Sequence, residues 1–169
     1  MFDTVLDLST FRTLDDLLES LYGIFKRDFI DTKTYLAGQI YINPLCQGKR
    51  NGKEEIFWHI VTRKNLRTKR RELDPERAKR IEWVKKAIEN HNHCEIKSFY
   101  YYEDNKKIRF YIWIFRYDFL VILQKLGRSE SYIVTSFYID NNKKRSKLEK
   151  KYNDYVAKVD SRLIGCEWF

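Results

Sequence analysis

Hydrophobic and polar positions near the N-terminus repeat with the period of a helix. The apolar members of this pattern are Leu14, Leu17, Leu18, Leu21 and Phe25. Thr13 and Asp16 stand three residues apart at the start of the run and resemble a capping box that uses the shorter acid. The pattern predicts an amphipathic helix over residues 13–30.

The segments that follow have the composition of strands and turns. Residues 37–43 (AGQIYIN) are strand-like, and the Asn51-Gly52 pair after them favours a tight reversal. Residues 55–62 (EIFWHIVT) are rich in aromatic and β-branched side chains, a composition that predicts a strand. A basic loop, residues 63–73 (RKNLRTKRREL), is expected directly after it.

A second helical pattern begins at Asp74 and Pro75, which suit the cap and the first position of a helix. Residues 76–90 (ERAKRIEWVKKAIEN) place lysines and arginines on most of the helix surface and keep one face apolar. The residues of that apolar face are Ala78, Ile81, Val84 and Ile88.

From residue 95 onward the pattern changes to short segments that are rich in strand-forming residues and separated by turns. Four strands are predicted, at residues 95–102, 107–115, 118–125 and 131–139. Their short connections suit antiparallel hairpins. A last helix, basic at its start, is predicted over residues 142–158, and the side chains expected to face inward are Leu148, Tyr152, Tyr155 and Val159.

Together these elements predict a single α+β domain over residues 1–169. The expected architecture is an antiparallel sheet of four to five strands, flanked by an N-terminal helix, a central basic helix and a C-terminal helix. Residues 1–36 would form an N-terminal helical extension, and residues 37–158 would form a nuclease-like core.

Composition is that of a folded protein with a strong basic charge. Of the 169 residues, 43% are hydrophobic, which is enough for a sizeable core. There are 33 lysines and arginines against 24 acidic residues, which gives a net charge of +9. Because excess positive charge attracts polyanions, we expect nucleic acid as the partner, with an anionic membrane surface as the main alternative.

Cysteine usage and hydropathy predict a cytoplasmic protein without a membrane partner. The three cysteines are widely spaced and form no CxxC pair, as expected for reduced thiols. The first residues lack the positive stretch of a secretory signal, and no apolar run reaches the roughly 20 residues that a transmembrane helix needs.

The strand predicted at residues 55–62 carries the most informative chemistry. Alternation would place His59 and Arg63 on one face of it, close together near its end. Such a pair suits RNA cleavage, because a neutral imidazole can take the 2′-hydroxyl proton while a guanidinium stabilises charge on the phosphate. The alternative is a histidine that only completes the hydrogen bonding at a sheet margin.

Cations near this strand predict the surface that would bind phosphate. Arginine offers a planar fork to phosphate oxygens, and lysine offers a point charge. The candidates lie in the basic loop, the central helix and the start of the last helix: Lys64, Arg67, Arg70, Arg71, Arg77, Arg80, Lys143, Lys144 and Arg145. The alternative is a set of solvated surface charges.

Hydroxyl groups on the last predicted strand are further candidates. Thr135 or Tyr138 would position the phosphate, and Ser136, on the same strand face as Tyr138, would contact the substrate. The alternative is ordinary strand composition, since threonine and tyrosine are common in strands.

We predict neither a metal ion nor a cofactor. His91, His93 and Cys94 stand close together, but no fourth ligand is evident and their spacing matches no standard zinc site. The chain contains no P-loop, dinucleotide fingerprint, GxSxG or HExxH motif.

The order of several short segments resembles a phage-associated branch of the small-nuclease superfamily that groups barnase, EndoU, the tRNA-cutting colicins and the RelE toxins. The segments are EEIFWHIVTRK, ERAKRIEWVKKAIEN, IRFYIWI, DFLVILQK, YIVTSFYI and KKRSKLEKKY, and the resemblance spans roughly residues 38–155. It implies a helical segment packed on an antiparallel sheet with a metal-independent ribonuclease site. His59, Arg63 and Thr135 match the catalytic positions of that pattern, and Arg77 and Arg80 match its R-x-x-R-x-x-W helix.

The sequence therefore predicts a metal-independent endoribonuclease that cleaves RNA by attack of the 2′-hydroxyl. The resemblance implies a toxin or an effector of a phage or mobile element, with tRNA or mRNA as substrate and a protein antitoxin or inhibitor as partner. The first alternative is a non-catalytic nucleic-acid-binding or inhibitor protein of phage origin. A second alternative is an interaction domain whose basic face meets an acidic protein.

Overall fold

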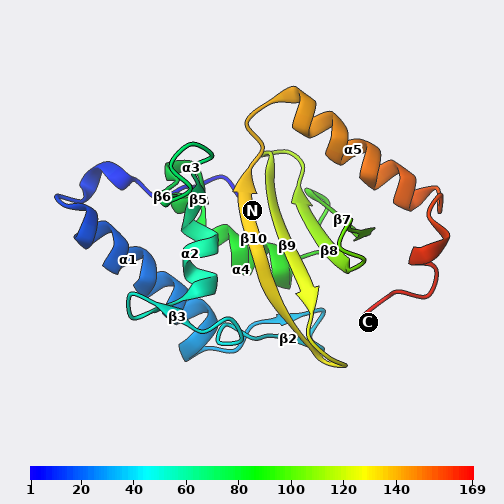
Figure 1. Ribbon diagram of the computed structural model, residues 1–169, viewed down its shortest axis with the longest axis horizontal. Coiled ribbons are helices and arrows are strands. Elements are labelled where there is room, and N and C mark those ends of the chain that lie inside the picture. Colours follow the sequence, from blue (N-terminus) through cyan, green and yellow to red (C-terminus); the bar gives the residue numbers. More distant parts are fainter.

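The fold is built on one curled sheet of six strands, in the order β1-β2-β10-β9-β8-β7 (Figure 1). The computed structural model describes all 169 residues. The pairs are antiparallel except for β2 with β10, which is parallel. The strands are β1 (Tyr35–Leu36), β2 (Ile40–Ile42), β7 (Ile96–Tyr102), β8 (Ile108–Ile114), β9 (Phe119–Lys125) and β10 (Glu130–Tyr138).

The α+β class and the four strands of the second half of the chain are confirmed, but the sheet is larger than expected. Residues 37–43 do not form one strand. Ala37 and Gly38 have positive φ angles of 52° and 68° and form a turn that pairs β1 with β2. These two short strands bring the sheet to six.

Helices cover both faces of the sheet. The large core holds side chains of α1 (Leu14–Lys26), α2 (Glu55–Val61) and α4 (Ile81–Glu89), together with alternate residues of β8, Phe110, Ile112 and Ile114. The intervening residues Tyr111 and Trp113 face a second, smaller cluster under α5 (Asn142–Val156). Figure 1 shows α5 on one side of the sheet and α1 with α2 on the other.

Residues 55–61 form helix α2, so the strand predicted there is wrong. The buried side chains of α2 are Ile56, Phe57, Ile60 and Val61, a set at helical spacing. Phe57 packs on Phe25 of α1 with 5.7 Å between ring centroids. Packing of Phe57 against Tyr22 and Phe25 of α1, and of α2 against β10, overrides the strand preference of aromatic and β-branched residues, as tertiary context often does.

The predicted basic loop is a hairpin. Strands β5 (Thr62–Lys64) and β6 (Arg71–Leu73) pair antiparallel, and the Asn65 carboxamide accepts hydrogen bonds from the amides of Arg67 and Thr68 at 2.9 and 3.1 Å. We call residues 62–73 the basic hairpin. A second ribbon, β3 (Lys49–Arg50) with β4 (Lys53–Glu54), turns at Asn51-Gly52 as predicted.

The central helix is divided into α3 (Pro75–Ala78) and α4. Asp74 caps α3 as predicted, by accepting hydrogen bonds from the amides of Glu76 and Arg77. The helix breaks at Arg80, which has φ −110° and ψ 16°. Its guanidinium lies over the rings of Trp83 in α4 and Tyr138 in β10, at 5.1 and 4.6 Å.

The first and last helices match the predictions, with differences at their ends. Thr13 accepts a hydrogen bond from the Asp16 amide at the start of α1, and a π-helical turn, Arg27–Asp31, follows that helix. Helix α5 ends at Val156, so Val159 is exposed and its predicted inward orientation is wrong. No helix is long and apolar enough to cross a membrane.

Candidate functional site

His59 lies in the last turn of α2 and faces Glu55 of the same helix. Its Nε2 atom is 3.4 Å from Glu55 Oε1, the contact expected for residues four apart on a helix. The two side chains are 27% and 24% exposed, so the pair is partly buried but open to solvent.

Two arginines from separate ribbons lie beside this pair. Arg50 of β3 approaches Glu55, with 3.3 Å between its Nη2 atom and Glu55 Oε1. Arg71 of β6 is held by Thr62, because its Nε donates to the Thr62 hydroxyl at 2.9 Å and its Nη2 to the Thr62 carbonyl at 3.3 Å. Arg71 makes no ion pair with any carboxylate, so its charge remains available to a ligand.

This environment favours the neutral form of His59. Burial lowers the pKa of His59 from its ordinary value of 6.5, and the positive charge of Arg71 lowers it further. The negative charge of Glu55 raises the pKa of His59, whereas the positive charges of Arg50 and Arg77 lower it, as that of Arg71 does. At neutral pH the imidazole is therefore an available proton acceptor.

Arg63 does not share a face with His59, which corrects the predicted pair. Because residues 55–61 are helical, Arg63 lies beyond the end of α2 on β5, where it is exposed and its Nε is 3.9 Å from Asp74 Oδ2. Arg71 and Arg50 take the place expected for Arg63. The Glu55–His59 pair has helical i,i+4 spacing, so a helical interpretation of residues 55–61 would have found it; nothing in the sequence signals Arg50.

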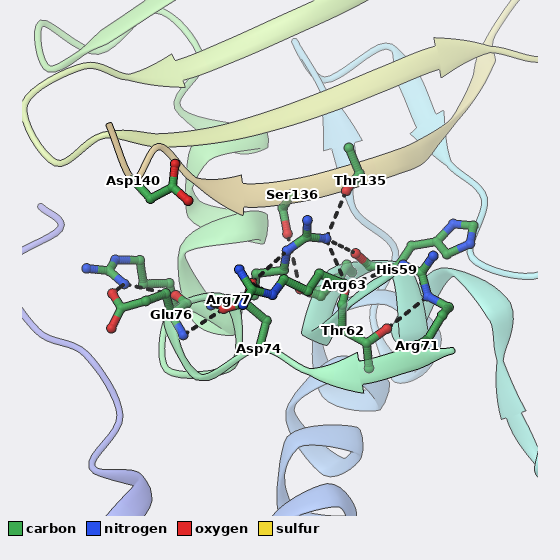
Figure 2. Close-up of polar contacts among 12 residues, drawn as sticks. His59, Thr62, Arg63, Arg71, Asp74, Glu76, Arg77, Thr135, Ser136 and Asp140 are labelled. Atoms are coloured by element: carbon green, nitrogen blue, oxygen red, sulfur yellow. Dashed lines mark hydrogen bonds and ion pairs between the residues drawn. The ribbon is translucent and has the colours of Figure 1, made fainter. Parts of the chain in front are cut away.

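Arg77 joins the end of α2 to β10. Its Nη1 atom donates to the carbonyls of His59 and Thr62 at 3.1 and 2.8 Å and to the Thr135 hydroxyl at 3.2 Å. The side chain is only 14% exposed. Figure 2 shows this guanidinium between α2 and β10, with the imidazole of His59 turned toward Arg71. Thr135 is thus connected to the backbone of His59 and makes no hydrogen bond with its ring.

The other predicted residues of β10 and the central helix lie in packed surroundings. Ser136 is fully buried, with its hydroxyl 3.5 Å from the Ile60 carbonyl. Tyr138 packs against the large core under the guanidinium of Arg80, and Arg80 pairs with Glu76 at 2.6 Å. None of these three side chains hydrogen-bonds to His59.

The basic hairpin carries a group of exposed cations without carboxylate partners. Glu72, its one acidic residue, receives two hydrogen bonds from the Asn65 amide at 3.0 and 3.1 Å. Four exposed cations of the hairpin have no carboxylate within ion-pair distance: Lys64, Arg67, Lys69 and Arg70. At the start of α5, by contrast, Lys144 pairs with Asp140 and Arg145 with Asp118, and only Lys143 is unpaired.

No group of histidine, cysteine and acidic side chains is placed to hold a metal ion. His91 packs edge-on against Phe110 and Phe169, with 6.1 and 5.1 Å between ring centroids. Comparisons with protein-family models, with curated proteins and with solved structures found no match to this chain. The resemblance to the small nucleases therefore stays a prediction.

Proposed function

We propose that this protein binds RNA through the basic hairpin and cleaves it without a metal ion at the His59–Glu55 pair. One observation carries the proposal: a partly exposed imidazole lies 3.4 Å from a carboxylate that also contacts Arg50, and burial together with the nearby charge of Arg71 lowers the pKa of that imidazole. Such a set contains a proton acceptor, a group that orients it and groups that bind phosphate.

His59 is the proposed general base. Its neutral ring takes the proton of a ribose 2′-hydroxyl, and the 2′-oxygen attacks the neighbouring phosphorus. The bond from phosphorus to the 5′-oxygen of the next nucleotide breaks, and that oxygen takes a proton from water. The products are a 2′,3′-cyclic phosphate and a 5′-hydroxyl. Glu55 orients the ring and stabilises the imidazolium that forms.

Arg71 is the proposed phosphate-stabilising residue. It is half-buried, has no carboxylate partner and is fixed by two hydrogen bonds to Thr62, so it needs little reorganisation to meet an anion. Arg50 already interacts with Glu55, so its contribution to phosphate stabilisation is weaker than that of Arg71.

The hairpin cations supply affinity that does not depend on sequence. Four unpaired cations on the hairpin displace counterions when they meet phosphates. The logarithm of the binding constant falls linearly with the logarithm of the salt concentration, with a slope of about −0.7 for each phosphate contact on a single strand. Four contacts therefore predict a slope near −3 for RNA binding.

Cleavage of RNA in EDTA tests the proposal. We expect total RNA to be cut to products with 2′,3′-cyclic phosphate ends, and His59→Ala to lose at least about 100-fold in rate, the usual contribution of a general base. His93→Ala, a histidine outside the site, is the matched control and should cleave normally. Full activity of His59→Ala, or no cleavage once EDTA is added, would contradict the mechanism.

A second candidate, RNA binding without cleavage, is favoured by the hairpin itself. Its four exposed cations have no carboxylate partner, and this does not depend on the role of His59. This function predicts salt-sensitive gel shifts that survive His59→Ala, with the RNA recovered intact. The same preparation, analysed for both bound and cut RNA, separates the two candidates.

A further inference from the structure

A cavity of about 610 Å³ lies between α1, α2 and the basic hairpin. Its volume lies in the roughly 300–1,000 Å³ range of small-molecule sites. One wall is apolar and is formed by Trp58, Leu14, Leu18 and Leu73. The rim is basic, with Arg50, Lys69, Arg70 and Arg71.

The apolar wall presents a fixed aromatic ring. Trp58 is half-buried, and its indole N–H donates to the Arg50 carbonyl at 2.8 Å. Its only polar atom is therefore satisfied. Phe57 packs against the ring with 5.1 Å between centroids, and the Arg50 guanidinium lies over it at 5.5 Å, so a base that packs on this ring would also contact Arg50. A fixed ring beside aliphatic side chains suits a planar, largely apolar group, and stacking on aromatics is a common way to bind a nucleobase.

The rim connects this cavity to the proposed catalytic pair. Arg50 and Arg71 line the cavity, and the same two arginines lower the pKa of His59. Lys69, Arg70 and Arg71 have no carboxylate partner, and the one acid of the rim, Glu72, is held by Asn65. An anion bound between Arg50 and Arg71 would thus meet the two guanidinium groups that act electrostatically on His59, although His59 itself does not line the cavity.

We infer that the cavity is a nucleoside subsite, which holds a base on Trp58 and the adjoining phosphate between Arg50 and Arg71. The inference rests on the proposed ribonuclease function and specifies that the site binds one nucleoside of the substrate and its phosphate. It explains why the apolar wall and the basic rim occur together: a base needs the first and its phosphate needs the second.

Binding of the four nucleoside 3′-monophosphates, measured by calorimetry, tests the inference. Ribose 5-phosphate and inorganic phosphate are the comparison ligands, because they carry the phosphate without the base. We expect at least one nucleotide to bind tenfold or more tightly than either comparison ligand. Equal affinities would mean that the cavity holds phosphate only and would overturn the inference.

Leu14→Asp tests the location. Leu14 is exposed at the first position of α1, where an acid is favourable to the helix, so the fold should survive. The new carboxylate enters the apolar wall of an anion site, and we expect nucleotide affinity to fall at least fivefold. Val156→Asp makes the same change at an exposed position of α5 outside this cavity and should leave affinity unchanged. Equal affinity in Leu14→Asp and the wild-type protein would overturn the inference.

RNA binding and cleavage by the wild-type protein separate the two proposals. If it binds and cuts RNA but takes up no mononucleotide, the subsite inference fails alone. If it neither binds nor cuts RNA, the proposed function fails. Nucleotide affinity that resists Leu14→Asp would place the ligand elsewhere on the basic surface.

Discussion

Replacing Arg77 by methionine tests whether this buried arginine holds α2 against β10. The change keeps most of the length and apolar surface of the side chain but removes the charged donor. Nη1 then no longer bonds to the carbonyls of His59 and Thr62 or to the hydroxyl of Thr135. Those acceptors belong to two segments that are far apart in the sequence, so no local contact replaces the bridge.

We expect Arg77→Met to lower the free energy of unfolding by about 3 kcal/mol. A hydrogen bond from a charged donor contributes about 1.5–3 kcal/mol, and the three contacts share one nitrogen, so they do not add in full. The side chain is only 14% exposed, which limits compensation by water. This loss would be a large fraction of the 5–15 kcal/mol typical of a domain.

Urea unfolding measures the effect, with Arg67→Met as the matched control. Arg67 lies exposed on the hairpin without an ion pair, and its replacement should change stability by less than about 0.5 kcal/mol. An Arg77→Met variant as stable as the wild-type protein would show that Arg77 does not hold α2 against β10. That result would mean that burying the guanidinium costs as much as its hydrogen bonds contribute.

Three further predictions concern the site and the first helix. The cleavage rate should rise with pH through a His59 pKa below 6.5. Arg71→Gln should move this rise to higher pH, because removal of a positive charge favours the imidazolium form of His59. An unchanged pH–rate profile in Arg71→Gln would contradict the proposed effect of Arg71 on His59. Arg67→Gln and Arg70→Gln together should reduce the salt slope of RNA binding by about 1.4, as measured by titration at several salt concentrations, whereas an unchanged slope would place the RNA elsewhere. Thr13→Ala should cost about 1 kcal/mol in thermal or urea unfolding by removing the cap of α1, with RNA affinity unaffected.

The second half of the chain could be predicted because its strands separate two environments. In β8, Ile112 and Ile114 face one core and Tyr111 and Trp113 the other, and both sets are buried. Strands of this kind are uniformly apolar and rich in aromatic and β-branched residues, so composition and turns between them are enough to locate them. Composition says less about the short strands at the edge of the sheet. The strand predicted at residues 37–43 contains β2 but misses β1, at residues 35–36.

Residues 55–61 show where composition misleads. Their aromatic and β-branched side chains favour a strand, while the positions of Ile56, Phe57, Ile60 and Val61 fit a helix. Over seven residues the two patterns differ little, and the packing of α2 between α1 and β10 decides the outcome. The error carried over to the site, since it placed Arg63 beside His59.

The α+β class, the four long strands and the helix caps at Thr13 and Asp74 follow from the amino-acid sequence alone, and so does the choice of His59 as a candidate residue. These features depend on local composition and on hydrogen bonds within a few residues. The surroundings of His59, by contrast, depend on how the chain folds. Arg50 and Arg71 reach its side of α2 from two separate ribbons, and Arg77 bridges it to β10. Such contacts join segments far apart in the chain, so no local pattern records them.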